Sequence, residues 1–394
     1  MSLIAAVGKA RALDGREAGL QAAHQAINGL GSATPIFGIV VSSYQYDAQQ
    51  VINGIAGLTG SMPIIGFSTS AGITADGVHP HSVIVALIAS PDVRADVQWL
   101  AGYTQASREV SQHVAELFKR KPQQLSIAFA DGFNADIEQL CAALPTSANL
   151  LGALSTADVQ SGNAYQIGGA QFGSGGLALA RLEGAISVGI GYDHGWQPVG
   201  AHFRVTRSRG FWVRTLDGRP ASEAYARLFD YPPREWAFPP LNQLVRLYPL
   251  GLEQLDKSLL IRSPLRVEAD GSFRMNTTVG DGADAYLMVG SLSACRLAAQ
   301  NAARQALFHL QGARPVLALV LTDIAWQMLH EAEPGSDIAA VHKVLGDDVP
   351  IAGGYTLGQI VPTENDRPKL LNQHMVVVLV GDPQDAFGKT QFNP

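Results

Sequence analysis

Hydroxyl-bearing side chains follow an apolar run at three places in the chain, and an amide follows the last of them. These residues are Ser68, Thr69, Ser70, Ser155, Thr156, Tyr355, Thr356 and Gln359. Hydroxyl and amide groups donate and accept hydrogen bonds, and glycines beside them let another group approach the backbone. We therefore predict a polar ligand-binding loop cluster. The alternative is a set of strand-end turns in which the hydroxyls bond to local backbone groups.

Residues 66–70 (GFSTS) invite comparison with the nucleophile elbow of hydrolases, G-x-S-x-G, but Ser70 stands where the second glycine is needed. The two cysteines, Cys141 and Cys295, lie in apolar helical segments and are expected to be buried. We find no paired carboxylates at acid–base spacing and no metal-ligand array. The sequence favours a binding protein over an enzyme, although an enzyme with a cryptic site remains an alternative.

Two further positions could contact a ligand. In the segment Asp193–Trp196, His194 stands beside a glycine and the indole of Trp196. A histidine there could satisfy backbone groups at a domain seam, contact a ligand or bind a metal. Arg262, in the segment LIRSP, is expected to line the same cleft as the hydroxyl groups, because a guanidinium pairs bidentately with carboxylates.

Composition limits the class of protein. Of 394 residues, 47% are hydrophobic and 16% charged, which argues against disorder. The net charge is −6 and the basic residues are scattered, which excludes the basic stripe of a nucleic-acid-binding protein. We find neither an apolar run of the roughly 18 residues that a membrane span needs nor a signal-peptide pattern, so we expect a cytoplasmic protein without membrane insertion.

The chain repeats one pattern of elements. Residues 63–73 (PIIGFSTSAGI) and 350–360 (PIAGGYTLGQI) share five of eleven residues, and each lies between apolar runs with a helix-sized segment before it. A weaker third copy covers residues 125–182. We predict an α/β fold of two related subdomains with pseudo-repeated β-α-β units and mixed sheets, whose glycine-rich strand ends face a shared cleft. The proline-rich residues 231–240 (YPPREWAFPP) predict the domain boundary.

Several segments, taken in order, resemble the FIST family ("F-box and intracellular signal transduction"). They are GFSTSAG, VGIGYDHGWQPVG, VTRSRGFWVRTLDGRPASEAY, YPLG, LIRSPL with DGSFR, and PIAGGYTLGQI. The resemblance divides the chain into a lead-in (1–33), a FIST N-like domain (34–230) and a FIST C-like domain (231–388). This chain departs from the family pattern at Asp323 and Trp326, where many relatives carry Cys and Arg, and at Gln359, where relatives carry Glu.

The resemblance implies a cytoplasmic sensor that binds a small polar metabolite such as an amino acid and signals through a partner protein such as a histidine kinase. One branch of the family implies a different ligand: haem, used to sense nitric oxide and regulate the kinase of a two-component system. In that case His194 is the residue we expect to ligate the iron. Whether the chain forms a homo-oligomer is left open.

Overall fold

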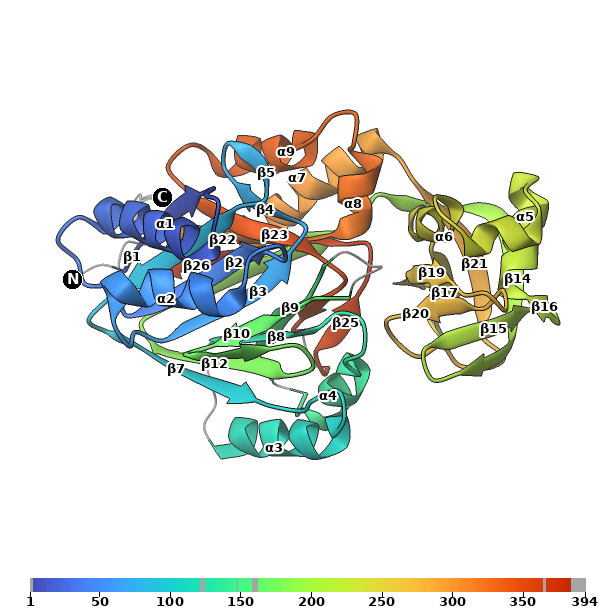
Figure 1. Cartoon of the computed structure of the whole chain (residues 1–394), viewed down its shortest axis with the longest axis horizontal. Helices are drawn as coiled ribbons and strands as arrows, with labels where there is room; N and C mark the ends of the chain where they lie inside the picture. The colour runs from blue at the N-terminus through green and yellow to red at the C-terminus, as the bar shows by residue number, and fades with distance from the viewer. Residues whose placement is uncertain (1–2, 121–124, 147, 158–161, 364–365, 384–394) are drawn as a thin grey trace, which may run out of the picture.

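The computed structural model describes residues 3–120, 125–146, 148–157, 162–363 and 366–383. Within these residues, three β-α-β units surround one core, and a separate domain is inserted into the third unit (Figure 1). In the view of Figure 1, the helices of units 1, 2 and 3 lie at the left, bottom and top, and the inserted domain projects to the right.

The three units share one order of elements, except that unit 3 has two helices between its parallel strands where units 1 and 2 have one. Unit 1 consists of β1 (Ile4–Ala10), α1 (Gly15–Leu30), β2 (Phe37–Ser43), α2 (Ala48–Thr59), β3 (Ile64–Thr69), β4 (Ala71–Thr74), β5 (Gly77–Pro80) and β6 (Val83–Ala89). Unit 2 consists of β7 (Val93–Leu100), α3 (Ser107–Arg120), β8 (Leu125–Asp131), α4 (Ile137–Ala143), β9 (Leu150–Ser155), β10 (Gln166–Gly168), β11 (Gln171–Gly173) and β12 (Leu177–Gly184). Unit 3 consists of β13 (Ser187–Asp193), α7 (Leu292–His309), β22 (Arg314–Asp323), α8 (Ile324–Leu329), α9 (Ser336–Leu345), β23 (Ile351–Thr356), β24 (Gln359–Val361), β25 (Lys369–Leu371) and β26 (Met375–Asp382).

The units exchange hairpins in a cycle. In the described part of the chain, each unit builds four strands of a six-stranded sheet, and a neighbouring unit supplies the other two. Hairpin β4–β5 of unit 1 joins the sheet of unit 3, β10–β11 of unit 2 joins that of unit 1, and β24–β25 of unit 3 joins that of unit 2. In every sheet the central pair is parallel and all other pairs are antiparallel.

The three sheets turn one apolar face toward a common core. Its members include Phe37, Ile39, Phe67, Ile127, Phe129, Leu151, Leu319, Leu321 and Val378. The opposite face of each sheet is covered by that unit's own helices, which is why the central strands are apolar on both faces. Several helices begin at a side chain that accepts a hydrogen bond from a free backbone N–H: Asp14 accepts from Glu17, and Ser291 from Ala294.

A glycine at the same place in each unit brings the two parallel strands close together. A Cβ at Gly66, Gly152 or Gly353 would lie 2.5, 1.9 or 1.9 Å from a carbonyl oxygen of the neighbouring strand. No larger residue fits at that distance, so the glycine of the repeated segment has the same packing role three times.

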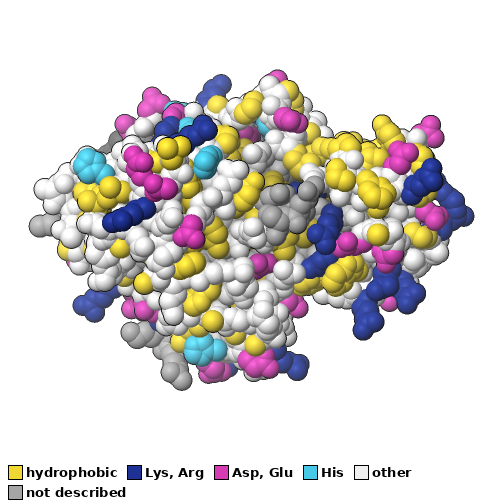
Figure 2. Space-filling model, in the orientation of Figure 1, with side chains coloured by type: hydrophobic (Ala, Val, Ile, Leu, Met, Phe, Trp, Pro, Cys, Tyr) yellow, Lys and Arg dark blue, Asp and Glu magenta, His cyan; other side chains and the backbone are white. Residues whose placement is uncertain are grey.

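The inserted domain spans residues 196–290 and has its own core around Tyr225, Trp236 and Phe273. Its elements are β14 (Trp196–Arg209), β15 (Trp212–Leu216), β16 (Arg219–Pro220), α5 (Ala221–Phe229), η1 (Pro233–Ala237), α6 (Leu241–Leu244), η2 (Val245–Leu247), β17 (Leu250–Glu253), β18 (Leu259–Arg262), β19 (Pro264–Val267), β20 (Phe273–Met275) and β21 (Asp284–Gly290). It contains 12 Lys and Arg against 10 Asp and Glu, whereas the whole chain has 28 against 34. Figure 2 shows several of these basic side chains on its surface at the right.

The expected mixed α/β fold with repeated β-α-β units is confirmed, and the copy that was weakest in sequence is a full third unit. The structure divides the chain elsewhere than the sequence analysis did. Residues 1–33, expected as a lead-in, supply β1 and α1 of unit 1, and the expected boundary at residues 230–231 falls inside the inserted domain. None of the described helices combines the length and apolar character that crossing a membrane requires.

Candidate functional site

The predicted hydroxyl residues come together where β3, β9 and β23 end. Ser68, Thr69, Ser155, Thr156, Tyr355, Thr356 and Gln359 are all buried there. The Ser68 hydroxyl donates to the Thr156 carbonyl (2.9 Å), and the Thr69 hydroxyl donates to the Tyr355 carbonyl (2.9 Å). These hydrogen bonds join one unit to the next.

Most of the other polar groups of this cluster also bond within the chain, although the Gln359 amide oxygen is buried without a hydrogen-bond partner among the described residues. The Gln359 amide donates to the Thr356 hydroxyl (2.7 Å), the Ser155 hydroxyl donates to the Ala130 carbonyl (3.0 Å), and the half-buried Ser70 bonds to Gln327 (2.5 Å). Thr156 donates weakly to the Ala157 carbonyl (3.3 Å). The cluster therefore holds the three units together, and its burial leaves little room for a ligand to reach these hydroxyl groups.

Carboxylates that the sequence analysis did not select lie at the ends of the neighbouring strands. The register of the parallel strands places Asp131 opposite Ser155 in unit 2 and Asp323 opposite Thr356 in unit 3. The equivalent pair in unit 1 is Ser43 and Thr69. Burial raises the pKa of both carboxyl groups, and that of Asp323 rises to about 6. Aligning the strand endings VSS, FAD and LTD of the three repeats would have identified these positions.

The inserted domain covers these two strand ends. Arg274 donates to the Phe133 carbonyl (2.7 Å) and to the Asn134 side chain (3.1 Å), in the turn that follows Asp131. The positive charge of Arg274 also favours the ionised form of the Asp131 carboxylate. Gln373 connects Asp323 to the same domain: its N–H donates to the carboxylate (2.9 Å), and its amide donates to Ser263 (2.7 Å).

Arg262 is buried where the inserted domain meets α4. Its guanidinium donates to Glu138 and to the carbonyls of Leu370 (3.1 Å) and Ile261 (3.2 Å). The Arg262 side chain is 4% exposed and that of Glu138 is 34% exposed. The carboxylate that the sequence analysis expected a ligand to bring to Arg262 is therefore supplied by Glu138, and among the described residues the hydrogen bonds of Arg262 do not reach the hydroxyl cluster.

A cavity of 270 Å³ opens over this ion pair. Its lining residues are Glu138, Cys141, Ala142, Leu260, Arg262, Asp366, Arg367, Pro368, Lys369 and Leu370. Charged groups of both signs line the cavity together with apolar side chains, and the exposed Lys369 and Asp366 pair with each other (3.4 Å). Burial, followed by the charge of Glu138, raises the pKa of the Cys141 thiol to about 12, so this sulfur stays protonated and is a poor nucleophile.

His194 and Trp196 lie away from that cavity, at the entrance to the inserted domain. The His194 Nδ1 accepts from the Trp196 N–H (3.3 Å), and its ring lies edge-on to His374 (4.7 Å between centroids). Burial lowers the pKa of His194. Trp196 is buried against Trp326, and its indole N–H donates to the Leu247 carbonyl (3.3 Å).

This arrangement does not fit an iron ligand well. Because Nδ1 of His194 accepts a hydrogen bond, the neutral ring carries its proton on Nε2, the atom that would otherwise bind iron. The Trp196 ring is already packed in the core and offers no face to a porphyrin. Among the residues that the structure describes, no group of three or more His, Cys, Asp or Glu is placed to hold a metal ion.

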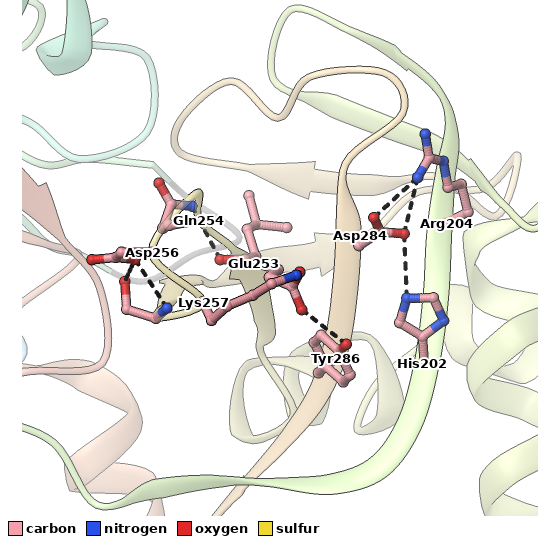
Figure 3. A network of polar contacts seen from close by, with 10 residues as sticks. His202, Arg204, Glu253, Gln254, Asp256, Lys257, Asp284 and Tyr286 are labelled. Atoms are coloured by element: carbon pink, nitrogen blue, oxygen red, sulfur yellow. Dashed lines mark hydrogen bonds and ion pairs between the residues drawn. The ribbon is translucent and has the colours of Figure 1, made fainter.

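An exposed polar network covers one face of the inserted domain (Figure 3). Nη1 of Arg204 donates to both carboxylate oxygens of Asp284 (3.0 Å each), and Asp284 also faces His202 (3.3 Å). Glu253 accepts from Lys257 (2.6 Å) and from the Tyr286 hydroxyl (3.1 Å). These partners lower the pKa of both carboxylates. The groups satisfy one another across adjacent strands, so we assign this network a structural role.

Comparison with solved structures finds only distant likeness. Cyanuric acid hydrolase from A. caulinodans is 9% identical, with 96% of this chain and 99% of that chain covered and a TM-score of 0.35. PurLQS from Thermotoga maritima is 12% identical, with 97% and 73% covered and a TM-score of 0.23. These scores are too low to indicate a shared activity, and no curated protein matches the chain.

Comparison with protein families is more informative. The FIST N domain matches residues 36–219, and the FIST C domain matches residues 221–362. Together these matches cover most of the chain and agree with the resemblance found in its motifs. The chain therefore belongs to the FIST family, whose domains are sensors of small ligands.

Proposed function

We propose that this chain is a cytoplasmic sensor of a small zwitterionic metabolite, such as an amino acid, and that the 270 Å³ cavity beside Arg262 is its ligand site. The observation that carries the proposal is the ion pair of Arg262 and Glu138 at the base of a cavity between two domains. Ligand sites commonly form at domain interfaces and combine an apolar wall with a few polar groups.

The lining matches the two charges of an amino acid. The carboxylates of Glu138 and Asp366 can accept from a ligand ammonium group, and Arg367 and Lys369 can donate to a ligand carboxylate. Leu260 and Leu370 supply an apolar wall for the ligand side chain. The second oxygen of Glu138 accepts from Thr278 (3.2 Å), which helps to fix the carboxylate in position.

Binding at this place would be communicated through domain contact. Glu138 belongs to α4 of unit 2, Leu370 to the exchanged hairpin of unit 3, and Arg262 to the inserted domain. A ligand that competes for these groups would change how firmly the inserted domain is held. We propose that a partner signalling protein, for instance a histidine kinase, responds to that change, and that the chain itself catalyses no reaction.

The test is calorimetric titration of the full chain with the common amino acids, followed by the Glu138→Gln variant. Glutamine keeps an acceptor for Arg262 but removes the charge, so the affinity for the best ligand should fall at least tenfold, in line with the roughly 1.5–3 kcal/mol of a charged hydrogen bond. The matched control is Glu253→Gln, which removes an ion-paired carboxylate of the inserted domain that lies outside the cavity. No binding by any amino acid, or equal weakening in both variants, would contradict the proposal.

A further inference from the structure

The three sheets meet at three seams, and at each seam the outer strand of one sheet lies near a hairpin of the next. The outer strands are β1, β7 and β13. Equivalent residues of the three outer strands can be found from the residues that they pair with in the adjacent strand. Lys9 pairs with Ile84, Trp99 with Ala178, and Tyr192 with Val376. Those three partners occupy the same position in β6, β12 and β26. Lys9, Trp99 and Tyr192 are thus the same position of the repeat.

Side chains close the first two seams. Lys9 forms an ion pair with Asp76 in the turn of hairpin β4–β5 and lies 3.2 Å from the His79 imidazole. Trp99 lies directly on the glycines near hairpin β10–β11, so that a Cβ at Gly176 would be 2.3 Å from its ring. In both cases the side chain of the outer strand reaches across to the exchanged hairpin.

The third seam is different. Among the described residues, Tyr192 has no contact of this kind with hairpin β24–β25, and its ring lies beside His374 instead (6.1 Å between centroids). A cavity of 750 Å³ occupies the seam, with Tyr192 on one side and Pro362 and Thr363, after β24, on the other. The cavity is within the usual size range of about 300–1,000 Å³ for ligand pockets.

The lining defines the chemistry of an occupant. Val188, Ile190 and Tyr192 form an apolar floor over the common core. The Nδ1–H of His309 donates to the Ile190 carbonyl (2.6 Å), which leaves Nε2 as a hydrogen-bond acceptor at the cavity. No Lys, Arg, Asp or Glu is among the described residues that line it, so nothing there would balance a charged ligand.

We propose that this seam binds a neutral aromatic compound that carries a hydrogen-bond donor. Its ring packs on Val188 and Ile190 and bridges the seam as Trp99 does in unit 2, and its donor bonds to His309. The residues that line this site are not those of the cavity beside Arg262, so the inference does not depend on the amino-acid site.

Indole is the probe, because it is neutral, aromatic and has one N–H. Calorimetric titration of the full chain should detect binding, and Val188→Phe, which fills the floor of the cavity, should weaken it at least tenfold. His309→Phe keeps the ring shape but removes the acceptor, and should weaken binding three- to tenfold. Melting temperatures of both variants show whether they fold, since the substituted side chains lie at the cavity surface.

Trp99→Ala is the matched control from the closed seam. Removing that indole ring leaves a ring-shaped space over Gly173 and Gly176, and apolar cavities made in this way bind small aromatic molecules. The Trp99→Ala variant should therefore bind two indole molecules, one at each seam. The double variant Val188→Phe/Trp99→Ala should bind only one. Failure of the wild-type chain to bind indole, or unchanged binding in Val188→Phe, would overturn the proposal.

Discussion

The first and third units end their central strands differently at the same position. Strand β2 ends at Ser43, whose backbone and hydroxyl bond to Ser82 and Gln45 of the same unit. Strand β22 ends at Asp323, which accepts from Ala325 at the start of α8 and from Gln373. Both residues are buried. A neutral hydroxyl in one unit is thus replaced by a carboxylate in the other.

The inserted domain explains the difference. Its Arg246 favours the ionised form of Asp323, and its Arg274 does the same for Asp131 of unit 2. Among the described residues, the hydrogen bonds of Ser43 stay within units 1 and 2. A carboxylate therefore occurs at a strand end where the inserted domain brings a cation near it, because burying an unpaired charge is costly.

The largest effect is expected from making unit 1 resemble unit 3. Ser43→Asp buries a carboxylate without a cation, and we expect a loss of about 4 kcal/mol in the free energy of unfolding at pH 8. Protonation of the new carboxyl group should make the loss smaller at pH 5. Urea unfolding at both pH values measures the effect, with Ser43→Ala as the control. Equal stability of the two variants at pH 8 would mean that unit 1 tolerates a charge.

The buried carboxyl group of Asp323 should make the free energy of unfolding depend on pH. Its folded pKa of about 6 lies above the ordinary aspartate value of 3.8. Its contribution to the free energy of unfolding is therefore fully present below about pH 4 and is lost as the pH rises through 6. The difference corresponds to about 3 kcal/mol. Asp323→Asn should remove this part of the decline between pH 4 and 7, measured by urea unfolding. The exposed Asp348→Asn is the control, and identical slopes in all three proteins would contradict the prediction.

The smallest effect is expected at Asp131. Asp131 accepts from the N–H groups of Phe133 and Asn134 at Oδ1 and also from the N–H of Gly175, so Asp131→Asn removes the attraction to Arg274 and can weaken the hydrogen bond from Gly175. Because burial raises the pKa of Asp131, the same change also relieves the cost of burying a charge, and we expect the net change in the free energy of unfolding to be within about 1 kcal/mol. A double-mutant cycle with Arg274→Met isolates that attraction. A coupling energy near zero would show that Arg274 holds the inserted domain through its backbone contacts alone.

The central strands of the fold were predictable because they are buried on both faces. Runs such as residues 83–88 and 375–380 are apolar throughout, and the glycine of the repeated segment marks the place where two parallel strands pack closely together. Strands β1, β7 and β13 alternate in burial as edge strands do. Because of this weaker pattern, the sequence does not identify the strand β1 within residues 1–33. The exchange of hairpins depends on tertiary pairing, which no local pattern specifies.

The site was less predictable for the same reason. The hydroxyl cluster was located correctly at the strand ends, but whether those groups face a ligand or one another depends on three segments meeting. Glu138 and Arg262 are separated by 124 residues, and nothing in either segment indicates that they form a pair. The open seam is visible only when Tyr192 is compared with Trp99 in three dimensions.

The cyclic exchange of hairpins has a consequence for biosynthesis. The sheet of unit 1 can be completed once residues up to 173 have left the ribosome, but the sheet of unit 2 lacks β24–β25 until residue 371 has emerged. Until then β9 is an unpaired edge, a feature that promotes association between chains. The hydrogen bond from the Leu3 backbone N–H to the Asp382 carboxylate (2.9 Å) also cannot form until Asp382 has emerged. Nascent chains of this protein should therefore remain accessible to chaperones at β9 until residue 371 has emerged.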